Sequence, residues 1–209
     1  MTSLFKGISE KEQNKLFTLL KSHVYTFDVN KDILQLIKGD NIIGIINEGS
    51  ADIIRINYNG DKSLIEKLEK DSIFGTYISF VNTNELQIIT KEKTTVTIID
   101  YRRLLNEDNI NKRYYNIFVQ NLFTILNQKI KEKNERISII SNKTIRNRLL
   151  EYFEINQSND GTNYIYLPFN FTEFASYLGV DRSAMTRELK NLKEEGFIEI
   201  KGKRIKILY

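Results

Sequence analysis

Hydrophobic positions recur at short intervals over the first hundred residues and then change their period. Ser9 can cap a helix from Glu10 to Leu20, in which leucines recur at helical spacing. Beyond this helix, turn residues separate short apolar runs, a pattern that is typical of strands. These turns are Lys38-Gly39-Asp40, Glu48-Gly49-Ser50, Asn59-Gly60-Asp61 and Gly75.

Asn59-Gly60 is the strongest of the turn signals. It lies between an alternating run, Ile54 to Tyr58, and a second run, Leu64 to Leu68. Asn-Gly tolerates the positive φ angles of a type I′ hairpin. A further β-branched strand is predicted from Thr94 to Ile99. Short strands at regular spacing predict a barrel or roll and not a parallel sheet with crossover helices.

The stretch from Asp108 to Ile140 contains no Gly or Pro and predicts one long helix. Its apolar stripe could pack against the chain's own strands, against a partner helix, or against both. The stripe is too short and too interrupted to establish a coiled coil. Its members are Tyr115, Phe118, Leu122, Ile125, Leu126, Ile130 and Ile137.

The last seventy residues begin with a predicted helix from Thr144 to Phe153. A polar loop (156–161) follows and leads to a predicted strand from Tyr164 to Leu167, which ends at Pro168. Asn170 and Glu173 then have the spacing of a capping box. Two helices follow, separated by a tight turn. Their signals are the apolar residues Phe174, Ala175 and Leu178, the turn residues Gly179 and Val180, the second cap Asp181, and the apolar residues Met185, Leu189 and Leu192.

This order is the helix-turn-helix arrangement, in which the first helix braces the second and the second enters the major groove of DNA. Guanidinium groups can bond two acceptors on guanine, and short hydroxyl side chains can reach a base edge or a phosphate. The predicted base-reading residues are Arg182, Ser183, Thr186 and Arg187. The predicted phosphate contacts are Asn170, Thr172, Lys190, Lys201, Lys203 and Arg204.

Two alternating runs, Phe197 to Ile200 and Ile205 to Ile207, follow a helix stop at Gly196 and predict a hairpin with a basic tip, Lys201 to Arg204. Such a wing suits a phosphate contact. A small helical domain with a solvated basic face, and a winged domain that binds only protein, are the alternatives. Helix, glycine turn, basic helix and basic hairpin in unbroken order favour DNA.

Composition narrows the classes of function. The chain has no cysteine, which excludes disulfides, thiolate nucleophiles and cysteine-bound iron–sulfur clusters. Its single histidine, His23, stands at what the pattern predicts to be a helix end and is expected to be an ordinary residue and not a metal ligand. Neither a signal peptide nor a membrane span is predicted, so a cytoplasmic location is expected. The net charge of +4 permits nucleic-acid binding without establishing it.

The stretch from Phe174 to Leu189, FASYLGVDRSAMTREL, closely resembles the helix-turn-helix of the Crp–Fnr superfamily of bacterial transcription regulators, and Glu194 to Ile198 continues the likeness. The opening Leu4 to Ser9 and the glycine positions Gly39, Gly49, Gly60 and Gly75 resemble the same family. The resemblance therefore spans nearly the whole chain. It implies an α+β fold with a cyclic-nucleotide-binding-type β-roll (1–107), a long dimerisation helix (108–140) and a winged helix-turn-helix domain (141–209).

The resemblance further implies a homodimer on a palindromic site in double-stranded DNA, with RNA polymerase as a partner. Its dimer interface would use Tyr115, Phe118, Leu122, Ile125, Leu126 and Ile130.

Two departures from the family pattern limit this inference. Cyclic-AMP-binding members carry a Gly-Glu pair and, some ten residues later, an arginine that neutralises the phosphate. Here Thr76 follows Gly75, and Asn84-Glu85-Leu86-Gln87 stands at the place of the arginine. A buried phosphate without its cation is unfavourable, so control by cyclic AMP is not expected. The recognition helix has Ser183 where guanine-reading members have an acid, which predicts an altered base pair at that contact.

Two rival functions were weighed. A sensor module whose DNA binding depends on an unidentified β-roll ligand would need a polar pocket, and the sequence shows no anion-binding cluster in that region. An enzyme would need a nucleophile with its base, a phosphate loop or a metal cluster, and the sequence has none of these patterns. No catalytic residue, metal or cofactor is therefore predicted.

Overall fold

The computed structural model describes residues 3–37, 41–56, 58, 60, 62–75, 86–105, 111–157 and 163–209. The chain divides into two compact units, Met1–Leu126 and Asn127–Tyr209. The predicted turn at residues 38–40, Asn59 of the predicted hairpin turn, the positions 76 and 84–85 and most of the loop 156–161 lie outside the described residues, as does the predicted start of the long helix.

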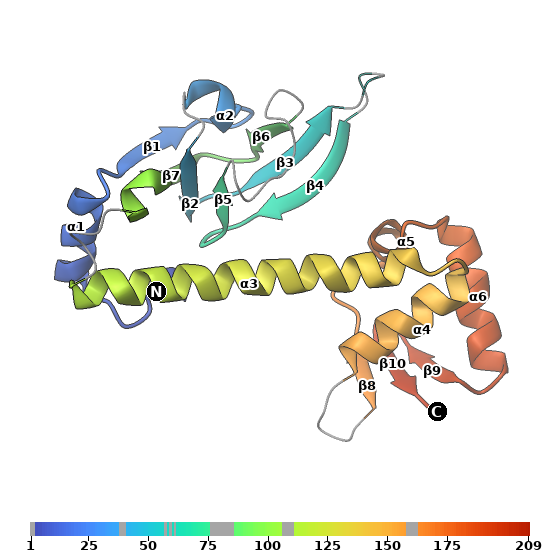
Figure 1. Cartoon of the computed structure of the whole chain (residues 1–209). Helices are drawn as coiled ribbons and strands as arrows, with labels where there is room; N and C mark the ends of the chain where they lie inside the picture. The colour runs from blue at the N-terminus through green and yellow to red at the C-terminus, as the bar shows by residue number, and fades with distance from the viewer. Residues whose placement is uncertain are drawn as a thin grey trace. The chain divides into compact units, whose positions relative to one another are not determined.

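The first unit is built on two antiparallel sheets (Figure 1). One sheet has four strands in the order β1-β7-β2-β5, and the other has three in the order β4-β3-β6. The predicted roll of short antiparallel strands is therefore confirmed. Its strands are β1 (His23–Phe27), β2 (Ile42–Glu48), β3 (Ala51–Ile56), β4 (Lys62–Leu68), β5 (Ile73–Gly75), β6 (Leu86–Thr90) and β7 (Thr94–Asp100).

The helices of this unit are η1 (Ser3–Phe5), α1 (Glu10–Leu19), α2 (Ile33–Leu36), η3 (Tyr101–Leu105) and the first part of α3 (Arg113–Ser141). Helix α1 begins as predicted, because Ser9 and Glu12 form a capping box with a Ser9 N to Glu12 Oε2 distance of 2.9 Å. His23 does not end a helix. It opens strand β1, and β1 pairs with β7 through His23 and Ile98.

The run Ile42-Ile43-Gly44-Ile45-Ile46 is apolar throughout because strand β2 is buried on both of its faces. Side chains alternate across a strand, so Ile42 and Ile46 enter the core between the two sheets, whereas Ile43 and Ile45 enter the core under helices α1 and α3. Gly44 lies opposite Phe74 on β5, and a Cβ at Gly44 would lie 2.1 Å from the Phe74 ring.

Much of the apolar stripe of α3 is buried in the core that lies between helices α1 and α3 and the four-stranded sheet. Tyr115, Phe118 and Leu122 are buried there with residues of η1, α1 and the sheet, and Tyr115 donates a hydrogen bond to the Leu104 carbonyl. Burial raises the pKa of the Tyr115 phenol. These three side chains are therefore buried in the single chain, and their predicted place in a dimer interface stays a prediction.

The second unit contains the end of α3, helices α4 (Ile145–Asn156), α5 (Phe171–Leu178) and α6 (Arg182–Glu194), and a three-stranded sheet. The sheet has the order β8-β10-β9 and consists of β8 (Tyr164–Tyr166), β9 (Ile198–Lys201) and β10 (Arg204–Ile207). The predicted hairpin wing is confirmed, with Ile205 opposite Ile200.

An aromatic cluster holds α5 against α4 in this unit. Tyr152 of α4 lies 4.7 Å from Phe174 and 5.8 Å from Tyr177, measured between ring centroids, and Phe169 stacks on Tyr177 at 5.0 Å. Burial raises the pKa of Tyr152 to about 12. Arg136 of α3 lies over the Tyr177 ring at 5.4 Å, which attaches the end of α3 to the same cluster.

Among the described residues, no helix has the length and apolarity that crossing a bilayer requires. Within the same ranges, no group of three or more His, Cys, Asp or Glu side chains is arranged to hold a metal ion.

Candidate DNA-binding surface

Helices α5 and α6 form the predicted helix-turn-helix. Asn170 accepts hydrogen bonds from the backbone N–H groups of Thr172 and Glu173 at 3.0 and 2.9 Å, and Glu173 accepts one from the backbone of Asn170. The capping box is therefore confirmed, and it begins α5 at Phe171. The side-chain oxygen of Asn170 accepts both bonds from Thr172 and Glu173 within the cap. Only the side-chain NH₂ group of Asn170 therefore remains to donate to a phosphate.

The turn between the helices depends on Gly179. Its φ of +64° is left-handed, a conformation that favours glycine, and the backbone N–H of Val180 bonds to the Ala175 carbonyl at 3.0 Å. Asp181 then caps α6 by accepting from the Ala184 N–H at 2.9 Å. The Ser183 hydroxyl and the backbone of Ala184 hold the pKa of the Asp181 carboxyl below its ordinary value, with the Ser183 bond as the larger cause.

Helix α6 is amphipathic in the way that its sequence predicts. Met185, Leu189 and Leu192 are buried in the core of the second unit. The opposite face is exposed and carries Arg182, Ser183, Thr186, Arg187 and Lys190. The structure thus brings the four predicted base-reading residues together on the first turns of one helix.

The two hydroxyl groups on this face already have acceptors. Ser183 Oγ lies 2.5 Å from Asp181 Oδ1, and Thr186 Oγ1 lies 2.8 Å from the Arg182 carbonyl oxygen. Each hydroxyl proton is therefore directed at the helix, and each oxygen keeps its lone pairs for an outside donor.

Two arginines of α4, which the sequence reasoning did not select, position the helix-turn-helix. Arg146 forms an ion pair with Glu195 and a longer one, at 3.4 Å, with Glu188, and it lies 5.1 Å from the Phe197 ring centroid. Its ion pairs raise the pKa of Arg146 and lower that of Glu195. Arg146 therefore neutralises acidic groups at the rear and the end of α6.

Arg148, the second of these arginines, binds the carboxyl end of α5 and the turn that follows it. Its guanidinium donates to the Asn142 carbonyl at 2.9 Å, to the Leu178 carbonyl at 2.9 Å and to the Gly179 carbonyl at 3.1 Å. One side chain thus joins the residue after α3 to the turn of the helix-turn-helix. No local pattern could have shown this role, because Leu178 is thirty residues from Arg148 in the sequence.

The wing carries the predicted basic tip. Lys201, Lys203 and Arg204 are exposed, and Arg204 lies opposite Tyr166 in the strand register. The Arg204 guanidinium lies 3.6 Å from the Tyr164 ring centroid and 5.6 Å from that of Tyr166. Stacking of this kind restricts the arginine side chain. Sequence reasoning missed both tyrosines, although their alternation in β8 could have indicated a shared face.

Two predicted phosphate contacts have competing interactions. Lys190 Nζ lies 3.5 Å from Glu194 Oε1, with both side chains largely exposed. Such an exposed pair contributes little stability and leaves Lys190 able to change partner. Thr172 is exposed at the start of α5, and its backbone N–H is bonded within the cap. Its hydroxyl remains the group that could meet a phosphate.

Comparisons with known proteins agree with this geometry. Residues 145–209 match the family described as the Crp-like helix-turn-helix domain. The probable transcriptional regulator flp of Lacticaseibacillus casei is 31% identical over 81 residues, which are 39% of this chain and 37% of that regulator. The match thus spans little more than a third of that relative's length.

Two solved structures resemble the whole chain. Catabolite activator protein from Thermus thermophilus is 18% identical, with a TM-score of 0.54 over 99% of this chain and 93% of that chain. A mutant of CooA from Carboxydothermus hydrogenoformans is 19% identical, with a TM-score of 0.62 over 100% of this chain and 92% of that chain. The resemblance inferred from the residues is confirmed. The chain has the fold of these two solved structures, and its residues 145–209 form a Crp-like helix-turn-helix domain.

Proposed function

We propose that the protein is a sequence-specific DNA-binding regulator that acts in the cytoplasm as a homodimer on a palindromic site. The observation that carries this proposal is the exposed face of α6. Arg182 and Arg187 lie on it, and among the described residues neither has an acidic partner, whereas the acids Glu188 and Glu195 are paired with Arg146. Two unpaired guanidinium groups on the first turns of such a helix are suited to guanine.

The hydroxyl groups refine the expected readout. Because Ser183 and Thr186 donate to acceptors of their own chain, their oxygens are left to accept from a base. In the major groove the exocyclic amino groups of cytosine and adenine are donors. We therefore expect Ser183 to tolerate either base where a carboxylate would select cytosine, with a discrimination lower by about 1–3 kcal/mol.

The wing and the start of α5 are proposed to hold the backbone of the DNA. Lys201, Lys203 and Arg204 stand at the hairpin tip, and Asn170 and Thr172 keep an amide and a hydroxyl group free of the cap. Each basic contact to a phosphate releases counterions, so affinity should fall steeply with salt. Substitution of Lys203 by Ala should reduce the salt slope by about one for each phosphate contact that is lost.

The dimer proposal rests on a second stripe of α3, which the sequence analysis merged with the buried one. Val119, Phe123, Ile130, Ile137 and Ile140 are exposed, and Phe123, Ile130 and Ile137 keep more than half of their surface in the single chain. With the partly buried Leu126 and the polar Lys133, these positions alternate at spacings of four and three, which is the heptad pattern of a coiled coil. Of the predicted interface residues, the exposed Ile130 and the partly buried Leu126 lie on this stripe.

Selection of bound duplexes from a random pool, with the purified full chain at physiological salt, tests the DNA-binding proposal. A palindrome with half-sites about 34 Å apart is expected for two recognition helices on successive major grooves. Repeating the selection with Ser183→Glu should sharpen one base pair in each half-site towards cytosine. Recovery of sequence-indifferent binding alone would refute sequence-specific regulation by the unliganded chain.

Sedimentation of Ile130→Glu tests the dimer. A charge at this heptad position should convert a dimer into monomers, because carboxylates would face each other across the seam. Thr124→Glu is the matched control, since Thr124 is exposed on α3, lies at a heptad position that faces away from the seam and receives the same charge. Dimers of equal strength for both variants would show that the stripe is not the interface. Contact with RNA polymerase, which the family resemblance implies, stays a prediction.

A further inference from the structure

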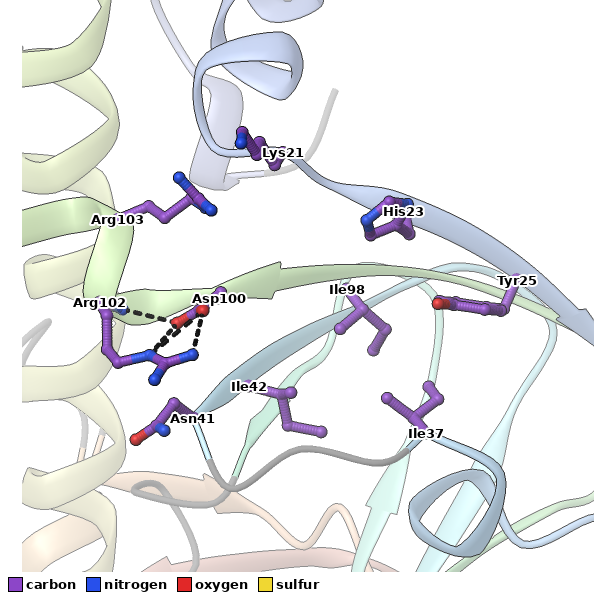
Figure 2. Close-up of a pocket in the computed structure, with 10 residues that line it drawn as sticks. All are labelled: Lys21, His23, Tyr25, Ile37, Asn41, Ile42, Ile98, Asp100, Arg102 and Arg103. Atoms are coloured by element: carbon purple, nitrogen blue, oxygen red, sulfur yellow. Dashed lines mark hydrogen bonds and ion pairs between the residues drawn. The ribbon is translucent and has the colours of Figure 1, made fainter.

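The first unit contains a cavity of about 270 Å³ at the open end of the four-stranded sheet, where β1, β7 and β2 lie side by side (Figure 2). His23 and Tyr25 come from β1, Ile98 and Asp100 from β7, and Ile42 from β2. The register places His23 opposite Ile98 and Ile42 opposite Asp100, so these side chains share one face of the sheet. The cavity is thus formed by the fold itself.

The cavity has an apolar floor and two cations at its rim. Ile37, Ile42 and Ile98 form an apolar floor and are nearly inaccessible to solvent, and the Tyr25 ring lies beside them. Lys21 and Arg103 are exposed at the rim, and Figure 2 shows both, with His23, on the side of β7 away from Ile37 and Asn41. The site therefore offers an apolar surface and a cationic edge.

The side chains at the rim of the cavity carry a net positive charge. Asp100 is the one acid among the described residues that line the cavity, and Arg102 donates to it through bonds of 3.0 Å from Nε and 2.7 Å from Nη2. The carboxylate of Asp100 therefore offsets the positive charge of Arg102. Among the described residues, neither Lys21 nor Arg103 forms a direct ion pair with an acid, although, after the bonds from Arg102, the charge of Arg103 also helps to lower the pKa of Asp100. The three cations Lys21, Arg102 and Arg103 face the single carboxylate of Asp100, so a net positive charge remains to attract an anion.

The sequence could not reveal this cluster, because the two cations are about eighty residues apart in the chain. Lys21 follows α1 in a left-handed conformation with φ of +45°, which turns the chain into β1, and Arg103 lies on η3 at the end of β7. None of the cavity residues belongs to the stretch, Gly75 to Gln87, where the family resemblance places a cyclic-nucleotide ligand.

We propose that this cavity binds a small organic anion, namely a carboxylate or phosphate ester that carries a compact apolar group. The anionic head would bond to Lys21 and Arg103, and the apolar part would cover Ile98 and the Tyr25 ring. The volume supports a small ligand, because 270 Å³ corresponds to about nine water molecules and lies near the lower end of small-molecule sites. A docked protein segment would need a larger surface.

Benzoate is the probe that matches this chemistry, phenyl phosphate tests the phosphate form, and benzamide has the shape of benzoate without its charge. Backbone amide shifts of the full-length protein are followed by NMR during titration. A ligand of this size should bind benzoate or phenyl phosphate with a dissociation constant of roughly 1–10 mM. Shifts should centre on residues 21–25 and 98–103, and benzamide should bind at least about tenfold more weakly.

Substitutions separate the cavity from general surface charge. Arg103→Gln and Lys21→Gln should each weaken anion binding by about tenfold, and Arg103→Lys should restore part of it. Lys93→Gln is the control, because Lys93 is exposed in the turn between β6 and β7 and does not line the cavity. All four changes are at exposed positions, and circular dichroism verifies the fold.

Three outcomes would overturn the proposal. They are equal binding of benzamide and benzoate, equal loss in Lys93→Gln and Arg103→Gln, and cavity-dependent binding of an acidic peptide without binding of either small anion. The site lies wholly within the first unit and involves no residue of the proposed DNA surface. Its failure would therefore leave the proposed DNA binding untouched.

Discussion

Replacement of Arg148 by Met is expected to destabilise the second unit by about 2 kcal/mol. The guanidinium donates three hydrogen bonds to backbone carbonyls, one at Asn142 and two, from the same nitrogen, at Leu178 and Gly179. Methionine keeps the aliphatic stem of the arginine and removes every donor. The carbonyl groups at the end of α5 then lose their partner from α4.

The magnitude follows from the number and the exposure of these bonds. A hydrogen bond from a charged donor contributes about 1.5–3 kcal/mol when it is shielded from solvent. Two shielded donor groups would contribute at least about 3 kcal/mol. Arg148 is half-buried and water can replace part of what is lost, so the expected loss is lower, about 2 kcal/mol. In a unit of fewer than a hundred residues, about 2 kcal/mol corresponds to a fall of roughly 8–16 °C in Tm.

Differential scanning calorimetry of the full chain measures the change as a shift of the transition that belongs to the second unit. Lys143→Met is the matched control, because Lys143 is exposed in the same turn and its loss removes one positive charge. Arg148→Lys should lie between the wild type and Arg148→Met, since an ammonium group cannot reach all three carbonyls in the same geometry. A Tm of Arg148→Met equal to that of Lys143→Met would refute the argument.

Three further predictions concern packing, pH and the wing. Gly44→Ala should destabilise the first unit by about 1–3 kcal/mol or more in thermal unfolding, because the Cβ of the alanine would lie 2.1–2.6 Å from the Phe74 ring. Addition of Phe74→Leu to this variant should recover part of the lost stability. The pKa of Asp181 is lowered in the folded chain, so the stability that its carboxylate contributes is present above the ordinary pKa of 3.8 and is lost as the pH falls through the pKa of the folded chain. Asp181→Asn should flatten this acid dependence of stability in urea titrations. An unchanged dependence would contradict the role of the Asp181 carboxylate as a cap. Tyr164→Leu should weaken DNA binding about two- to fivefold in fluorescence anisotropy, because Arg204 loses its stacking partner at 3.6 Å, while an unchanged affinity would show that the stack does not prepare the wing.

Local signals made the helix-turn-helix predictable. The capping box of Asn170 and Glu173, the left-handed Gly179 and the Asp181 cap are all determined by residues within a few positions of one another. The same holds for the hairpin wing and for the pairing of β3 with β4, which both agree with the alternating runs of the sequence.

Features that depend on distant neighbours were missed. Strand β1 carries exposed Val24 and Tyr25 and therefore shows no alternation of apolar and polar residues, which led to the wrong prediction of a helix end at His23. Helix α3 carries two apolar stripes, and only the packing of Phe118 and Leu122 in the first unit separates the buried stripe from the exposed one. The bonds of Arg148 and the cationic cavity likewise join segments far apart in the chain.

The most direct test of the account is to measure the affinity of Arg187→Ala for the selected palindrome and for a random duplex at the same salt concentration. The account predicts a loss of about 1–3 kcal/mol on the palindrome and little change on the random duplex, because Arg187 is exposed on the base-reading face of α6. An equal loss on both duplexes would contradict it and would make Arg187 a contact to the phosphate backbone.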